Sequence, residues 1–167
     1  MLSPAIPANE PGRLAALREL LLLDTPPEAR FDKLVEFAAS EFAMPIVLFT
    51  LVEDSRQWFK AKVGTTLCST DREVSFCAHA ILQPDLLMVP DALEDARFFD
   101  NPLVTGAPHI RFYAGAPLVL ATGEAIGTLC LIDTVPRRLD DIDQLMLGSI
   151  RDLLLEEVVA QHAKEPG

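Results

Sequence analysis

The hydrophobic pattern of this chain has helical spacing near its start, alternates through the middle and returns to helical spacing at the end. Residues 10–23 place Leu14, Leu17 and Leu21 on one face and predict a first helix. The Asp-Thr-Pro-Pro sequence at 24–27 ends that helix. Residues 1–9 hold two prolines and little pattern, so we expect them to form a flexible lead-in.

A second helix is predicted to begin at the prolines. Thr25 and Glu28 have the spacing of a capping box, and Pro26 takes the first helical position, where its missing N–H has no cost. The apolar positions that follow form one stripe, at Phe31, Leu34, Val35, Ala38 and Phe42. Pro45 then closes the segment.

Two pairs of apolar runs predict two antiparallel hairpins. Residues 46–52 and 57–63 are rich in β-branched and aromatic residues and flank a polar turn. Residues 111–120 and 125–133 flank a turn that contains Gly123, which suits a tight connection.

The segment between the hairpins, residues 64–110, has a mixed pattern. It predicts a short helix capped by Ser75, a brief strand over residues 86–90 and a long loop rich in Asp, Pro and Gly. Loops of this length in compact domains are usually functional. We therefore expect this middle segment to hold a ligand.

The last helix starts at the acidic residues 140–143, which favour the positive end of the helix dipole. One apolar stripe is expected to cover the sheet, at Ile142, Leu145, Met146, Ile150, Leu153 and Leu154. A second set points elsewhere, at Leu147, Leu155 and Val159. Because surplus apolar surface usually marks an interface, we expect a homodimer built from the first and last helices.

Hairpins flanked by terminal helices predict an α+β domain with its helices on one face of the sheet. Half of the 167 residues are apolar and 23% are charged, as in folded globular proteins. The formal net charge of −11 is spread along the chain and disfavours binding to nucleic acid or to a membrane surface. The sequence shows neither a secretory signal nor an apolar run long enough to span a membrane, so we expect a cytoplasmic location.

Cys68, Cys77 and Cys130 are an odd number of cysteines without a CxxC pair, which fits reduced thiols. The spacing of Cys68 and Cys77 relative to His79 and His109 follows no recognised zinc pattern, so no metal site is expected. Cys77 lies near the start of the short helix and His79 two residues later. This pair is either a redox sensor or cofactor attachment point, or a buried thiol beside a hydrogen-bonded histidine.

Four segments together resemble a bacterial GAF domain: residues 22–64, 73–82 (EVSFCAHAIL), 89–106 and 110–133. The resemblance implies a five- or six-stranded antiparallel sheet, terminal helices on one face and a ligand pocket on the other. It also implies one GAF domain over residues 10–163, followed by a C-terminal tail at 164–167. GAF domains bind diverse small molecules and commonly report to a kinase, cyclase or phosphodiesterase output domain.

The resemblance leaves three functions open: a ligand sensor, a thiol enzyme similar to free methionine sulfoxide reductases, and a ligand-free dimerisation module. The reductases carry further cysteines in the loop that corresponds to residues 90–110, and this chain has none there. A photoreceptor-type covalent bilin is excluded because Ile110 stands where a thiol is needed. In the pattern of cyclic-nucleotide-binding GAF domains a lysine follows the asparagine, whereas here Asn101 is followed by Pro102. This departure disfavours cyclic-nucleotide binding without excluding it.

We therefore predict a sensory or regulatory GAF domain that is not an enzyme, and leave its ligand and any cofactor unidentified. Arg111 is a candidate for holding an anionic group, or for a structural tie to Asp91 and Asp95. Alternation along the strand places Phe112 and Tyr113 on opposite faces, so at most one of them points into a pocket. The predicted ligand-binding residues are Phe76, Cys77, His79, Asp91, Phe98, Asn101 and Arg111.

Overall fold

The computed structural model describes residues 1–164, with side chains described as far as residue 160. Six antiparallel strands form one sheet in the order β3-β2-β1-β6-β5-β4. The strands are β1 (Ile46–Val52), β2 (Arg56–Val63), β3 (Ser69–Asp71), β4 (Leu87–Val89), β5 (Phe112–Val119) and β6 (Ala125–Asp133). The α-helices are α1 (Glu10–Glu19), α2 (Ala29–Glu41), α3 (Phe76–Ala80), α4 (Pro102–Thr105) and α5 (Asp141–Lys164). Two 3₁₀ turns, η1 (Arg72–Val74) and η2 (Ala92–Glu94), complete the described elements.

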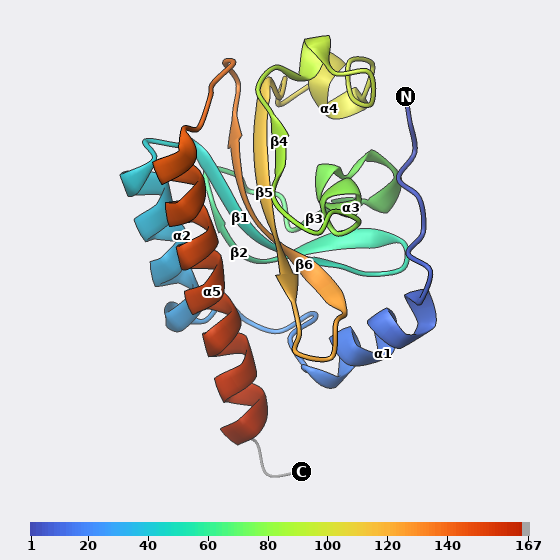
Figure 1. Ribbon diagram of the computed structural model, residues 1–167, viewed down its shortest axis with the longest axis vertical. Helices are drawn as coiled ribbons and strands as arrows, with labels where there is room; N and C mark the ends of the chain where they lie inside the picture. The colour runs from blue at the N-terminus through green and yellow to red at the C-terminus, as the bar shows by residue number, and fades with distance from the viewer. Residues whose placement is uncertain (165–167) are drawn as a thin grey trace.

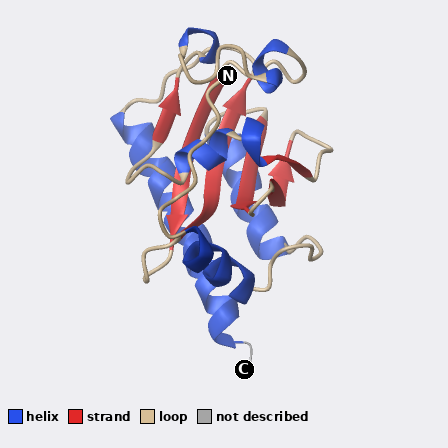
Figure 2. Cartoon of the chain, turned by 90° about the vertical axis from the view of Figure 1, so that its right-hand side faces the viewer, coloured by secondary structure: helices blue, strands red, loops and turns tan. Residues whose placement is uncertain are grey.

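The sheet separates two layers. The long helices α2 and α5 lie side by side on one face (Figure 1), which we call the helix face. The short helices and the loops around them lie on the other, which Figure 2 presents to the viewer and which we call the pocket face. The predicted α+β fold with an antiparallel sheet is confirmed; of the terminal helices, α2 and α5 share one face, whereas α1 lies apart from them.

Both predicted hairpins are present. β1 pairs with β2 across a short polar turn, and β5 pairs with β6 across a turn in which Gly123 has a φ of 102°. The middle segment contains the expected short helix and the short strand β4, but also β3, η1, η2 and α4, which the sequence pattern did not reveal. These pieces have three or four residues each, too few for a period to show.

The core of the helix face is continuous and apolar. From α2, Phe31, Val35 and Ala38 are fully buried against the sheet, and the Phe31 ring meets Phe49 of β1 edge-on at 5.2 Å. The predicted capping box is wrong, because α2 begins at Ala29. The Thr25 hydroxyl instead donates to the Leu22 carbonyl and accepts from Lys60.

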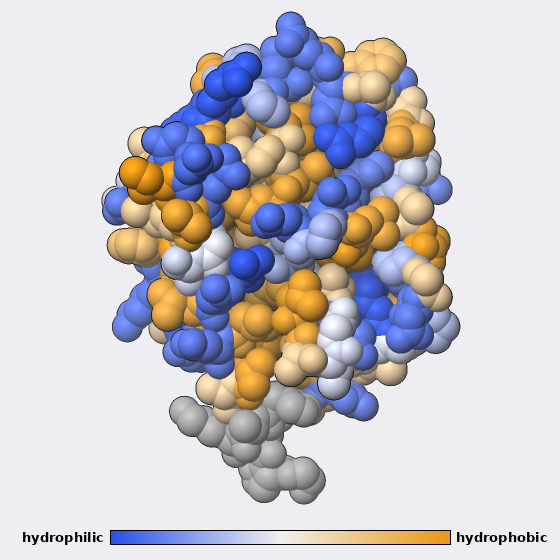
Figure 3. Space-filling model, in the orientation of Figure 1, coloured by the Kyte–Doolittle hydropathy of each residue, from blue (hydrophilic) through white to orange (hydrophobic). Residues whose placement is uncertain are grey.

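The assignment of faces on α5 was partly wrong. The residues buried against the sheet are Leu147, Ile150, Leu154 and Val158, which have helical spacing. Ile142 and Leu145, expected to cover the sheet, are 70% and 73% exposed. Figure 3 shows hydrophobic surface interrupted by polar residues on this side of the molecule.

The first helix is shorter than predicted and lies at one end of the sheet. α1 ends at Glu19, and Leu21 beyond it is exposed with a φ of 56°. Residues 1–8 have no helix or strand and pass along the pocket-face side (Figure 1). Their flexibility stays a prediction, and of the predicted tail only residue 164 falls within the described part of the chain.

A buried ion cluster holds α1 to the sheet and to η1. The Glu10 carboxylate accepts from Arg13 at 2.7 Å and from Arg72 of η1 at 2.6 Å, and both arginines are almost fully buried. Arg13 also donates to the carbonyl of Val52 at the end of β1. Hydrogen bonds from Arg13 lower the pKa of Glu10 to about 2, assisted by Arg72 and opposed by burial.

Candidate functional site

Helix α3 is held against the sheet by the hydroxyl of Ser75. Its Oγ accepts from the backbone N–H of Ala78 at 3.0 Å, as the sequence predicted for a helix cap, and donates to Oε1 of Gln57 on β2 at 2.7 Å. All five residues of the helix are buried. One serine thus defines both where α3 begins and how it is tied to the sheet.

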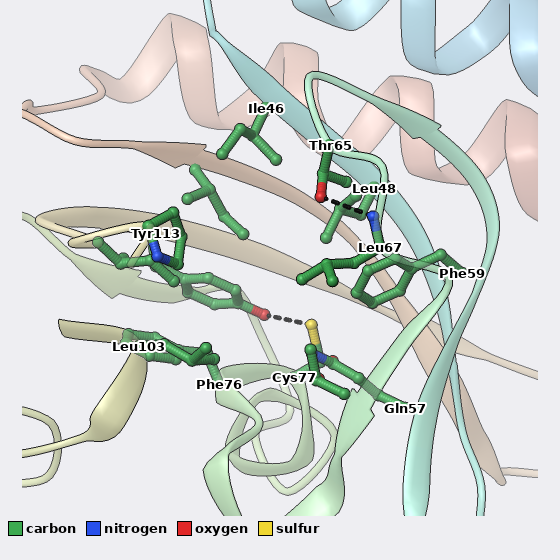
Figure 4. Close-up of a pocket in the computed structure, with 14 residues that line it drawn as sticks. Ile46, Leu48, Gln57, Phe59, Thr65, Leu67, Phe76, Cys77, Leu103 and Tyr113 are labelled. Atoms are coloured by element: carbon green, nitrogen blue, oxygen red, sulfur yellow. Dashed lines mark hydrogen bonds between the residues drawn. The ribbon is translucent and has the colours of Figure 1, made fainter. Parts of the chain in front are cut away.

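A cavity with about 50 Å³ of free space lies between α3 and the sheet (Figure 4). Strands β1, β2, β5 and β6, helices α3 and α4 and the loop before β3 all contribute to its wall. None of the lining residues is charged, and most are apolar. They are Ile46, Leu48, Gln57, Phe59, Thr65, Leu67, Thr70, Phe76, Cys77, Leu103, Pro108, Ile110, Tyr113 and Ile132.

Tyr113 crosses the cavity and points its hydroxyl at Cys77 (Figure 4). The Tyr113 ring packs over the backbone of Gly115, two residues later in β5, and this position must be a glycine to leave room for it. A Cβ at Gly115 would be 2.2 Å from the Tyr113 hydroxyl oxygen. As predicted from alternation, Tyr113 faces the pocket, whereas Phe112 packs in the core of the helix face.

Polar groups converge on the buried thiol of Cys77. The hydroxyls of Tyr113 and Thr128 donate to its Sγ at 3.1 and 3.0 Å, and Thr128 is in turn bonded to Thr50. The Sγ of Cys130 on β6 lies 3.8 Å away. Burial opposes ionisation of Cys77, but hydrogen bonds from Cys130, Thr128, Thr50 and Tyr113 outweigh it and lower its pKa to about 7.

Cys130 and Tyr113 respond in the opposite direction. Burial raises the pKa of the Cys130 thiol well above its usual value, and the neighbouring Cys77 raises it further. Burial likewise raises the pKa of Tyr113, which therefore remains a hydrogen-bond donor. The cluster combines one easily ionised thiol with groups that keep their protons.

Of the seven predicted site residues, Phe76 and Cys77 line the cavity. Phe98 stacks behind Phe76, with ring centroids 4.0 Å apart, and supports the wall. His79 points away from Cys77: its Nε2 is 3.2 Å from the Leu2 carbonyl oxygen, and its ring meets Phe98 edge-on. Burial lowers the pKa of His79.

Asp91, Asn101 and Arg111 lie outside the cavity wall and make local structural contacts. Asp91 caps η2 through the N–H of Leu93. Asn101 caps α4 and donates to the Val74 carbonyl, which ties α4 to the segment before α3.

Arg111 donates to the backbone carbonyls of Val104 and Ile110. The tie to Asp91 and Asp95 that the sequence suggested for it is not formed, because Asp95 pairs with Arg97. Arg111 thus holds the loop after α4 rather than an acidic side chain.

Sequence reasoning missed Thr128, Cys130 and the aliphatic wall. Alternation along the strands shows which of their residues share a face, but the pairing of β1 with β6, which sets Thr50 opposite Thr128 and Leu48 opposite Cys130, joins segments about 80 residues apart. The sequence pattern within either strand does not reveal which residues of β1 and β6 pair. In the described part of the chain, no three His, Cys, Asp or Glu side chains are placed to hold a metal ion, and no helix is long and apolar enough to cross a membrane.

Comparison with known proteins identifies one curated relative. The chain is 42% identical over 159 residues to a cyclic di-GMP phosphodiesterase of Pseudomonas aeruginosa, and the match covers 95% of this chain but 27% of that protein. The chain thus spans about a quarter of the relative's length. The relative is named as an enzyme, which contradicts our expectation that this protein is not one, and we withdraw that expectation.

Solved structures share the fold at low identity. The GAF domain of a phosphoenolpyruvate-protein phosphotransferase from Coxiella burnetii superposes with a TM-score of 0.68 at 14% identity, covering 94% of this chain and 98% of that one. A free methionine-R-sulfoxide reductase from Neisseria meningitidis superposes with a TM-score of 0.62 at 18% identity, covering 96% and 99%. The model of the GAF domain family matches residues 26–160. The chain belongs to the GAF domain family, as the sequence predicted.

Proposed function

We propose that this domain binds a small, neutral, mostly apolar molecule in the cavity beneath α3. The observation that carries the proposal is the wall of that cavity, which contains no charged side chain. A phosphate or carboxylate buried there would lack a cationic partner, and burying an unpaired charge is strongly unfavourable. The polar side chains of the wall, which include Gln57, Thr65, Thr70 and Tyr113, can orient a neutral ligand.

The signal would leave the cavity through β6 and α5. Ile132, in the cavity wall, is the penultimate residue of β6, and the chain then runs through residues 134–140 into α5. By likeness to the Pseudomonas relative, the output to which the domain reports is cyclic di-GMP hydrolysis. Cyclic di-GMP itself carries two phosphates, so it fits the output better than this uncharged cavity.

The binding experiment compares phenol, a neutral probe, with benzoate, its anionic counterpart of similar size. A ligand that binds only the folded state raises stability by about 2.7 kcal/mol at a hundredfold excess over Kd, which is several degrees of melting temperature for a chain of this size. We expect this shift with phenol and not with benzoate.

Two tryptophan variants locate the binding. Leu103→Trp fills the cavity from α4 and should abolish the phenol shift, whereas Leu93→Trp, at an exposed position outside the cavity wall, should preserve it. Equal shifts with benzoate, or a phenol shift that persists in Leu103→Trp, would contradict the proposal.

We also propose that the domain forms a homodimer along the outer side of α5. Ile142, Leu145 and Leu153 are large apolar residues at least half exposed on this helix, and burying each is worth about 1.5–3 kcal/mol before the entropy of association is subtracted. Light scattering should report twice the 18.3 kDa chain mass. Leu145→Glu should give monomers and Val135→Glu, exposed but off the helix, should not; a wild-type monomer would refute the dimer.

A further inference from the structure

The cluster of Cys77 and Cys130 is an unassigned pair of thiols at the inner end of the cavity. The two Sγ atoms are 3.8 Å apart, one on α3 and the other on the central strand β6. A disulfide bond requires about 2.05 Å, so the sulfurs must approach by somewhat less than 2 Å. Neither cysteine forms a disulfide bond in the structure, and the third cysteine, Cys68, is exposed.

The surroundings make the two thiols unequal. Cys77 Sγ accepts hydrogen bonds from Tyr113 and Thr128, which stabilise the thiolate, the form of cysteine that acts as a nucleophile. Cys130 of β6 is buried among apolar residues of the pocket face, and this burial raises the pKa of its thiol and keeps it protonated. One sulfur is therefore set up to react first and the other to react with the product.

Cys77 also lines the cavity, whereas Cys130 does not. The free space of about 50 Å³ is several times the roughly 10–15 Å³ that a single water requires, so the cavity has room for a small molecule. Hydrogen peroxide is of that size and is uncharged, as the cavity wall requires. A small hydroperoxide can thus reach the reactive sulfur without unfolding of the domain.

We propose that Cys77 is a peroxide-reactive thiol and that Cys130 is its resolving partner. The Cys77 thiolate attacks one oxygen of the peroxide, the O–O bond breaks, and the departing oxygen leaves as water after taking up a proton; Cys77 becomes a sulfenic acid. The sulfur of Cys130 then attacks the sulfur of Cys77, the S–O bond breaks, and the hydroxyl leaves as a second water with the Cys130 proton. Two thiols and one hydrogen peroxide give one disulfide and two waters, so two electrons pass from sulfur to oxygen.

Formation of this disulfide would draw α3 towards β6. Because Cys77 belongs to the cavity wall, the movement changes the space in which the proposed ligand binds. Oxidation and ligand occupancy would then act on the same helix. The thiol chemistry itself does not depend on the ligand, and each can fail without the other.

The test treats the purified protein with hydrogen peroxide, blocks remaining thiols with iodoacetamide and identifies cross-linked peptides by mass spectrometry. We expect a Cys77–Cys130 disulfide that dithiothreitol reverses. Cys68→Ser should form it at the wild-type rate. Cys130→Ser should instead accumulate a sulfenic acid on Cys77 that dimedone traps, and Cys77→Ser should leave Cys130 unmodified.

A second variant tests the activation of Cys77. Tyr113→Phe removes one donor to Cys77 Sγ while preserving the ring, and we expect disulfide formation at neutral pH to slow by several-fold to about tenfold. A melting curve of each variant confirms that it folds. Oxidation confined to Cys68, a disulfide that includes Cys68, or a Tyr113→Phe variant that reacts at the wild-type rate would overturn the proposal.

Discussion

The two faces of the sheet bury similar kinds of side chain but arrange them differently. On the helix face, α2 and α5 pack a continuous apolar layer against β1, β2, β5 and β6. On the pocket face, short helices and loops enclose a cavity, and hydroxyls and thiols are buried among the aliphatic residues. The difference indicates that the helix face supplies most of the stability and that the pocket face is free to respond to small molecules.

The largest expected effect comes from matched phenylalanine truncations on the two faces. Phe49→Ala opens a new cavity in the helix-face core and should lower the free energy of unfolding by about 3–5 kcal/mol. Phe59→Ala enlarges a space that already exists, so its cost should fall below that range. Urea unfolding measures both, and equal losses would remove the distinction between the faces.

The next effect concerns the ion cluster that joins α1 to the sheet and to η1. Glu10→Gln leaves the buried Arg13 and Arg72 without a carboxylate and should cost about 3 kcal/mol at neutral pH, the value that corresponds to lowering the carboxyl pKa from 4.5 to about 2. Because the folded-state pKa is lowered, this stabilisation is complete above pH 4.5 and disappears as the pH falls through about 2.

The matched control for that cluster is Glu19→Gln, an exposed glutamate on the same helix. Unfolding of the three proteins at a series of pH values should show the deficit of Glu10→Gln shrinking with acid and Glu19→Gln following the wild type. A deficit that does not change with pH would show that the carboxylate charge is not its cause.

A smaller effect tests whether the Tyr113 hydroxyl on the pocket face stabilises the Cys77 thiolate. Gly115→Ala forces the Tyr113 ring to move, at a cost of about 1–3 kcal/mol for overpacking, and withdraws a donor from Cys77. The ultraviolet absorbance of the thiolate should titrate near pH 7 in the wild type and at higher pH in the variant. An unchanged midpoint would mean that Tyr113 does not stabilise the thiolate.

The ionisation of the Cys77 thiol also makes the free energy of unfolding depend on pH. Since the folded-state pKa of Cys77 is lowered from 9.0 to about 7, its contribution is fully present above pH 9 and is lost as the pH falls through about 7. Cys77→Ser should flatten this part of the stability profile. A wild-type stability that falls steadily from pH 7 to pH 9 would contradict the lowered pKa.

How far the sequence predicts the molecule depends on whether the controlling interaction is local. The hairpins, the stripe of α2 and the Ser75 cap follow from spacing within a few residues, and all are present. The buried face of α5 was misassigned because leucines occur almost all around it, at Leu145, Leu147, Leu153, Leu154 and Leu155, so that spacing does not single out one stripe.

The candidate site shows the same limit. Phe76 and Cys77 were identified because a capped short helix is visible in the sequence, and Tyr113 was narrowed to one of two residues by alternation. The pairing of Cys77 with Cys130 spans 53 residues and depends on how α3 docks on β6. Of the remaining predicted residues, His79 and Phe98 pack behind the cavity wall. Asp91, Asn101 and Arg111 serve as helix caps and loop ties.

The most direct test of the difference between the faces is a titration of the labelled protein with phenol, followed by the amide signals in heteronuclear NMR spectra. Saturable shifts should appear around the cavity, at Cys77, Leu103 and Tyr113, while the α2 amides stay in place. Shifts that are largest on α2 and α5, or absent around the cavity when phenol raises the melting temperature, would contradict the account.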